Sequence, residues 1–215
     1  LLEIAAENGV HQSKLVLSYL VDSPDNNIQN NTTAFRYLLE ALKSKDPQSV
    51  YFYLYKSYKN IIFISSRDGN MILSDQKLTN SEMDFLGKGS FGRVYSAKLG
   101  DTKKIAFKRP SILEMINWND QDEIKSTAEK IVSFLEEVEL MSKIPSHPNV
   151  ISMIGVQINP LGIIQEFAYH GSFAKYLRSL KLIKLRTVLK WIYEISEGMR
   201  HLHEYKIFHG DLALR

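Results

Sequence analysis

The chain has 215 residues, of which 44% are hydrophobic and 24% charged, ordinary values for a globular protein with one large or two small domains. The formal net charge of +3 is too small to indicate a nucleic-acid-binding protein, and no dense basic run with interleaved aromatic residues is present. The absence of cysteine excludes a disulfide framework and a thiolate metal site, and it fits a reducing compartment.

No apolar run reaches the length of a membrane span, and no signal peptide is visible. The first residue is Leu1 rather than methionine, so we expect a piece of a longer protein. Its expected location is the cytoplasm, or the cytoplasmic side of a membrane protein if a span lies upstream.

Residues 1–58 are predicted to be helical. Ser13 and Thr33 are placed to cap two helices with apolar faces, a polar turn-forming stretch lies between them, and a short helix follows Pro47. Residues 4–7 align with residues 37–40 at an offset of 33 (37 − 4), and this period weakly resembles ankyrin repeats. The alternative is an unrelated small helical domain. In either case, this segment is a candidate site for a protein partner.

Residues 59–80 are predicted to form a hairpin or linker. Two apolar runs, residues 61–64 and 71–73, flank an Asp-Gly turn at Asp68-Gly69. The pair is either a lead-in to the next domain or a connector. The polar residues 76–80 then mark a boundary, and a further domain is expected over residues 81–215.

Residues 86–108 carry the clearest chemical signal. Gly87, Gly89 and Gly92 have the spacing G-x-G-x-x-G, which a dinucleotide-binding turn shares. After Gly92 the residues alternate with period two, which predicts a strand, whereas a dinucleotide-binding turn would open a helix. Glycines let a backbone approach an anion closely, and Lys108, at the end of the next strand, can supply a charge for the same phosphates. The alternative is a glycine-rich hairpin with a surface lysine.

A polar connection is expected over residues 111–125 and an amphipathic helix over residues 126–143. The apolar stripe of this helix has Glu137 and Glu139 on its two flanks. Periodicity does not say which glutamate meets Lys108, and either could be a solvated helix charge.

Two strands, residues 150–157 and 161–167, are predicted next, joined by a turn at Asn159-Pro160. A short helix over residues 173–180 and a long amphipathic helix over residues 185–203 follow. Gly198 in the long helix predicts a close packing contact.

This succession of motifs resembles a protein kinase domain over about residues 83–215. The fold class is therefore α+β, a kinase-like N-lobe of antiparallel sheet plus one helix, with the first C-lobe helices. The resemblance implies ATP and Mg²⁺ as cofactors and a protein substrate. It selects Glu137 as the ion-pair partner of Lys108, both counted with the catalytic residues. It further implies that ATP is bound by the glycines and Lys108, together with Leu86, Ser90, Phe91, Val94, Ala106, Gln165, Glu166 and Ala168.

The same resemblance assigns Asp211 as the catalytic aspartate that receives or orients the substrate hydroxyl proton. The run Asp211-Leu-Ala-Leu-Arg215 is similar to the tyrosine-kinase loop. Gly210 replaces the usual arginine, which puts control by a phosphorylated activation loop in doubt. The interval from Lys108 to Glu137 is 29 residues (137 − 108), longer than usual for the family, which indicates an insertion.

The metal ligands are expected beyond residue 215, so no metal-binding residue is assigned within the chain. The isolated polypeptide is accordingly expected to be inactive, with the apolar stripe of its long helix exposed. The alternative function is a pseudokinase or scaffold that binds nucleotide or partners without phosphoryl transfer.

Overall fold

The structure is a computed structural model that describes residues 62–66, 71–74, 78, 83–89, 92–100, 102–111, 120–158 and 160–213. The helices expected within residues 1–58, and their ankyrin-like repeat, lie outside these residues. So do the turn around Asp68-Gly69 and the loop residues Ser90 and Phe91.

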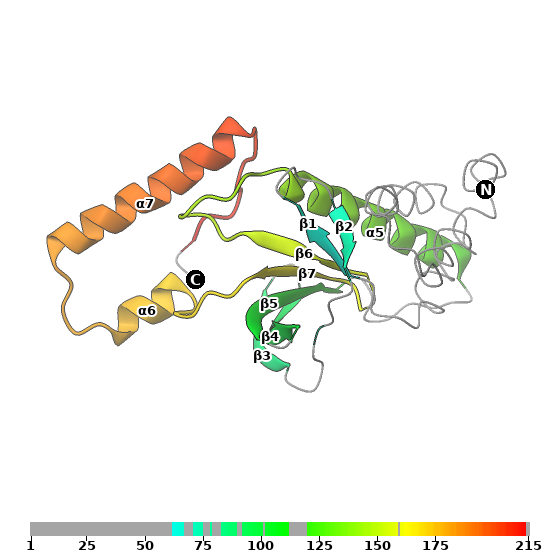
Figure 1. The fold of residues 1–215 in the computed structure, drawn as a ribbon, viewed down its shortest axis with the longest axis horizontal. Coiled ribbons are helices and arrows are strands. Elements are labelled where there is room, and N and C mark those ends of the chain that lie inside the picture. Colours follow the sequence, from blue (N-terminus) through cyan, green and yellow to red (C-terminus); the bar gives the residue numbers. More distant parts are fainter. Residues whose placement is uncertain are drawn as a thin grey trace.

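The described residues form one antiparallel sheet and three helices, which confirms the α+β class (Figure 1). The strand order in this seven-stranded sheet is β2-β1-β6-β7-β5-β4-β3. The strands are β1 (Ile62–Ser65), β2 (Met71–Ser74), β3 (Asp84–Gly89), β4 (Gly92–Leu99), β5 (Lys103–Pro110), β6 (Met153–Gln157) and β7 (Gly162–Glu166). The helices are α5 (Gln121–Ser142), α6 (Phe173–Ser179) and α7 (Leu185–Glu204).

The two strands expected within residues 59–80 are present and belong to this sheet. β1 pairs antiparallel with β2, from Ile62 opposite Ser74 to Ser65 opposite Met71. The other edge of β1 pairs with β6, where Phe63 lies opposite Val156. The sheet therefore continues upstream of the boundary drawn at residue 81, which itself remains a prediction.

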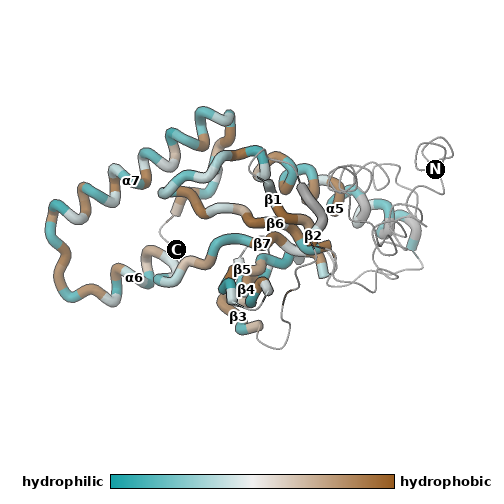
Figure 2. Tube along the Cα trace, viewed as in Figure 1, coloured by the Kyte–Doolittle hydropathy of each residue, from teal (hydrophilic) through white to brown (hydrophobic). Residues whose placement is uncertain are grey.

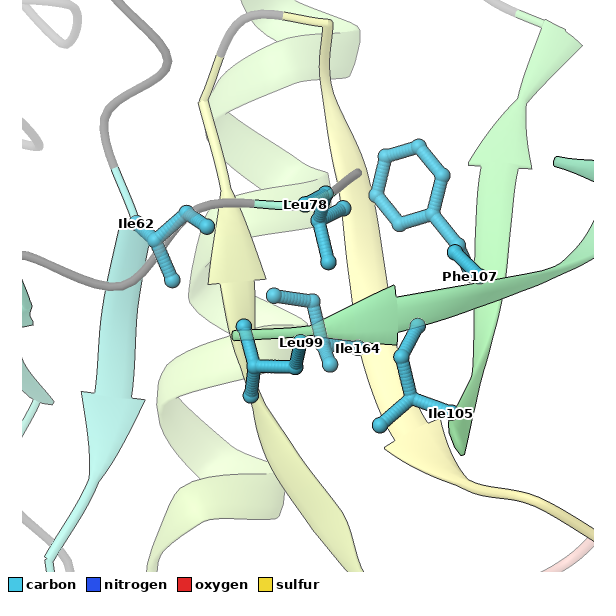
Figure 3. Packing of buried hydrophobic residues seen from close by; sticks show 7 residues of the cluster. Ile62, Leu78, Leu99, Ile105, Phe107 and Ile164 are labelled. Atoms are coloured by element: carbon cyan, nitrogen blue, oxygen red, sulfur yellow. The ribbon is translucent and has the colours of Figure 1, made fainter. Parts of the chain in front are cut away.

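One face of the sheet is closed by a cluster of buried apolar side chains (Figure 3). Ile105 and Phe107 are two residues apart on β5, so both point to this face, and neither is exposed to solvent. Burying each such side chain contributes about 1.5–3 kcal/mol to folding. The cluster consists of Ile62, Leu78, Ala97, Leu99, Ile105, Phe107 and Ile164.

Helix α5 contacts β6. The apolar stripe predicted for this helix is confirmed, because Ile131, Leu135 and Val138 are fully buried. The strand register places Phe63, Val156 and Ile163 in one row on the sheet face opposite the cluster. This same row continues to Lys108.

The start of α5 differs from the sequence-based prediction, since the helix begins at Gln121 and not near residue 126. Asp120 is its N-cap, and the Asp120 side chain accepts hydrogen bonds from the backbone N–H groups of Asp122 and Glu123. The acids that suggested a polar loop are instead first-turn residues, where the helix dipole favours negative charge.

Two strand boundaries also differ. β6 begins at Met153 and not at residue 150, because residues 147–150 form a turn closed by the Val150 N–H bond to the His147 carbonyl, 3.1 Å. β5 runs on to Pro110, where the strand had been expected to stop at Lys108.

The close contact predicted at Gly198 is present. A Cβ atom added there would lie 2.7 Å from the Asn149 carbonyl oxygen. Beside this crossing the rings of His147 and His201 stack at 4.6 Å, and His201 Nε2 donates to the Pro145 carbonyl at 2.9 Å. These contacts dock α7 on the loop that follows α5.

Elsewhere α7 extends away from the sheet, with hydrophobic and hydrophilic residues alternating along it (Figure 2). Its apolar stripe is exposed, as expected, with Leu185 at 73%, Leu189 at 57% and Ile192 at 58%. Within the described part of the chain, no helix combines the length and apolar character that crossing a membrane requires.

Candidate nucleotide-binding site

The three glycines lie on a β-hairpin. Gly87 pairs with Val94, and Gly89 on β3 pairs with Gly92 on β4. Gly92 has φ +140°, and a Cβ there would lie 1.9 Å from the Arg109 carbonyl oxygen, so the position requires glycine. An eight-residue strand begins at Gly92, which excludes the helix that a dinucleotide-binding turn would open.

Lys108 lies in register with this hairpin. Val94 is directly opposite both Gly87 and Lys108, so the three residues form one row across β3, β4 and β5. Neighbours in such a row are about 5 Å apart and project from the same face. Lys108 is half-buried there. The structure thus brings the lysine alongside the glycine-rich hairpin.

A second row on the same face holds two further predicted site residues. Ala106 lies two residues before Lys108 and pairs with Gln165 on β7. Gln165 also pairs with Met153 on β6. Leu86 is the extra residue at a register shift in β3 and is half exposed. Val94, Ala106 and Gln165 thus lie on the same face of the sheet as Lys108.

The segment after β7 is fixed by backbone contacts. The Glu166 N–H donates to the Ser152 carbonyl at 3.0 Å, and the Ser152 N–H donates to Glu166 Oε2 at 3.4 Å. The Ala168 carbonyl accepts a bond from Gly171 at 3.0 Å, which occupies one of its two lone pairs.

Two residues around this segment were not predicted from the sequence. Lys104 on β5 places its ammonium 4.3 Å from the Phe167 ring centroid, a cation–π contact. Ser152 holds Glu166 as described above. No sequence motif identifies either residue, because each contact joins segments that are far apart in the chain.

Glu137 is exposed on α5. Among the ion pairs of the residues that the structure describes, none joins Glu137 to Lys108. Glu139, on the other flank of the stripe, is paired with Lys143 at 3.0 Å. The choice of Glu137 as the partner of Lys108 therefore stays a prediction.

Asp211 lies on the segment after α7 and is exposed. Its N–H donates to His209 Nδ1 at 3.4 Å, which places any ring proton of a neutral His209 on Nε2. Gly210 has φ +69° with open space around it, so its backbone adopts the left-handed conformation at no steric cost.

The residues on this face fit a nucleotide phosphate chain. A Cβ placed at Gly87 or Gly89 would meet nothing within 4 Å, which leaves open space for an anion beside the backbone. Lys108 supplies a cation on the same row. ATP would be held by these backbone groups and this ammonium.

An antiparallel lobe with a glycine-rich hairpin alongside a strand lysine, one packed helix and a following helical region make up this α+β domain. The family model for protein tyrosine and serine/threonine kinases matches residues 81–215. The chain belongs to this family.

Curated relatives include enzymes of several kinds. The chain is 32% identical over 152 residues to the human tyrosine-protein kinase Fer, covering 69% of this chain and 17% of Fer. It is 34% identical to the PR5-like receptor kinase of Arabidopsis thaliana over 64% of this chain and 20% of that protein. It is 28% identical to the MAP kinase kinase kinase SSK2 of Saccharomyces cerevisiae over 73% of this chain and 9% of that protein. The chain thus spans a fifth or less of the length of these three relatives.

Proposed function

We propose that the protein containing this chain transfers a phosphoryl group from ATP to a protein side chain, with tyrosine as the preferred acceptor. The main observation that supports this proposal is the row formed by Gly87, Val94 and Lys108 across three strands. It places a cation next to glycine backbone on the face that also holds Ala106 and Gln165. Family membership supports the same reaction class.

Each residue has a distinct role in this proposal. The backbone of the glycine hairpin, with Ser90 and Phe91, covers the phosphates, and Lys108 holds the α- and β-phosphates. The Glu166 carbonyl and the Ala168 N–H meet the adenine edge, while Leu86, Val94 and Ala106 pack against the ring. Bound Mg²⁺ would neutralise phosphate charge.

Asp211 is proposed to orient the acceptor hydroxyl and accept its proton. Its exposure leaves the carboxylate accessible to a protein substrate. Glu137 is proposed to hold the Lys108 ammonium once α5 brings the two together. Most of the rate enhancement then comes from positioning and electrostatic stabilisation of the transferred group.

Tyrosine specificity rests on a separate argument. Ala213 and Arg215 stand two and four residues after Asp211, an arrangement similar to the tyrosine-kinase loop. Fer supports this choice by its name, whereas the names of the plant and yeast relatives do not mention tyrosine. The acceptor therefore has to be tested directly.

The test compares Lys108→Met with Lys103→Met in the full-length protein. Lys103 is an exposed lysine on the same strand, so the control makes the same chemical change away from the site. We expect Lys108→Met to lower phosphoryl transfer by about 10²–10³, as for the loss of one transition-state donor. Lys103→Met should stay within about twofold, the range of a surface change.

Two outcomes would contradict the proposal. A Lys108→Met protein that keeps the wild-type rate would show that Lys108 does not hold the phosphates. Equal transfer to a serine peptide and to poly(Glu,Tyr) would refute the tyrosine preference while leaving the kinase activity intact.

A further inference from the structure

The β1–β2 hairpin lies outside the residues that match the kinase family model, yet it is hydrogen-bonded into the same sheet. Ile62 and Phe63 of β1 are completely buried, and they point to opposite faces. The hairpin therefore contributes to the core on both sides of the sheet.

The approach of β1 to β6 is unusually close at Gly155. Ile64 pairs with Gly155, and a Cβ added at residue 155 would lie 2.1 Å from the Phe63 carbonyl oxygen. The nearest atoms belong to backbone, which cannot rotate away as a side chain would. Glycine at 155 is thus a requirement for β1 to occupy this edge.

The hairpin also reaches the end of α5. The last four carbonyls of a helix have no backbone N–H donor within the helix. In α5 the Glu139 carbonyl accepts from Ser142 Oγ at 2.7 Å. The Leu140 and Met141 carbonyls accept from the N–H groups of Lys143 and Ile144, both at 3.2 Å.

The fourth carbonyl, of Ser142, accepts from the Ser65 hydroxyl of β1 at 3.2 Å. This is the only one of the four bonds that comes from a different element of the fold. The same hydroxyl lies 3.4 Å from the Ser66 carbonyl, a longer contact. Ser142 itself is buried, with 6% of its surface exposed.

We propose that the β1–β2 hairpin completes the C-terminal cap of α5 through Ser65 and so positions the helix that carries Glu137 against the nucleotide-binding strands. Ser65 is a positioning residue, acting through α5. The expected effect on catalysis rests on the proposed kinase function. The effect of the hairpin on the position of α5 does not depend on that function.

The test uses the full-length protein with three substitutions at Ser65 and Gly155. Ser65→Ala removes the donor, and Ser65→Thr keeps a hydroxyl. Gly155→Ala displaces β1 without touching Ser65. The matched controls are Ser196→Ala, an exposed serine that bonds a backbone carbonyl at 2.7 Å, and Gly100→Ala, a glycine with φ +61° and open space around it.

The first readout is amide hydrogen exchange in residues 143–144 and the last turn of α5. We expect Ser65→Ala to speed this exchange about fivefold, equivalent to losing one ordinary hydrogen bond, and Gly155→Ala to speed it more. Ser65→Thr should restore protection, and both controls should match wild type there. Unchanged exchange at the α5 end in both Ser65→Ala and Gly155→Ala would overturn the proposal.

The second readout is steady-state kinetics. Because β1 is hydrogen-bonded to β2 and β6 and not to β3, β4 or β5, the KM for ATP should change less than about twofold while kcat falls with α5 protection. A lowered kcat with unchanged α5 exchange would refute positioning through the helix. If the wild type transferred no phosphoryl group at all, the kinase proposal would fail while the exchange data still decided the link between hairpin and helix.

Discussion

The crossing of α7 over the loop after α5 can be tested by a substitution with two opposite effects on the free energy of unfolding: a gain from helix propensity and a loss from steric overlap. Gly198 is the sole buried residue of α7, and the Asn149 backbone lies against it. We consider Gly198→Ala, the smallest substitution that adds a Cβ. In an exposed helix interior, this change would stabilise the protein by about 1 kcal/mol through helix propensity.

The contact geometry predicts the reverse outcome. The new methyl group would lie 2.7 Å from the Asn149 oxygen and 3.3 Å from the Asn149 Cβ, both inside normal contact distance. Overpacking of this kind costs about 1–3 kcal/mol. Subtracting the propensity gain leaves a net loss of about 1 kcal/mol.

Urea unfolding followed by tryptophan fluorescence measures this difference. Trp191 on α7 reports on the helix, since its ring contacts Phe173 and Tyr176 at centroid distances of 5.2 and 6.1 Å. A loss of 1 kcal/mol lowers the midpoint by about 0.5 M if the urea dependence is about 2 kcal/mol/M.

Ser196→Ala is the matched control, because it adds helix propensity on the same helix without a clash; it should stabilise by a few tenths of a kcal/mol. If Gly198→Ala raised the midpoint as much as propensity alone predicts, the tight packing of α7 on Asn149 would be refuted.

Three further predictions follow from described contacts. Asp120→Ala should destabilise by about 1 kcal/mol through loss of the α5 N-cap, and Asp120→Asn should recover most of it, measured by thermal unfolding. Phe107→Ala should cost about 3–5 kcal/mol because it empties a fully buried site, and a loss below 1 kcal/mol would contradict the core assignment. The hydrogen bond from Arg200 lowers the pKa of Glu197. The stabilisation that this bond gives to the folded protein is therefore fully present above the ordinary glutamate pKa of about 4.3, and it is lost as the pH falls through the lowered pKa. Melts between about pH 5 and pH 3 should show this loss in the wild type and not in Glu197→Gln, and identical pH profiles would contradict the assignment.

Local periodicity was sufficient to predict β4 and the buried face of α5. The alternation after Gly92 identified β4, and the helical spacing of Ile131, Leu135 and Val138 identified the buried face of α5. These patterns are readable because each residue's face follows from its position within a single element.

The start of α5 was missed for a different reason. Asp120 and the acids after it are equally suited to a polar loop and to a capped first turn. Which one forms depends on whether the helix is already held by packing, and the apolar residues that pack lie further along the chain.

The non-local features could not be read from the sequence. The pairing of β1 with β6 joins Ile62 to Gln157, and nothing near either residue specifies the other. The rows that bring Lys108 to Val94 and Ala106 to Gln165 are likewise consequences of register. The exposure of Glu137 depends on how closely α5 packs against the sheet, which the sequence of the helix alone does not show.

The place of β1 in the sheet also bears on self-association. β6 is hydrogen-bonded on both sides, to β1 and to β7, so its backbone is not available to another strand along the paired residues. Without β1, the segment from Gly155 to Gln157 would become an open edge of largely buried residues, a template for pairing with a second copy of the chain. The hairpin therefore moves this edge of the sheet from β6 to β2, and truncations that begin after residue 65 would expose the backbone of β6.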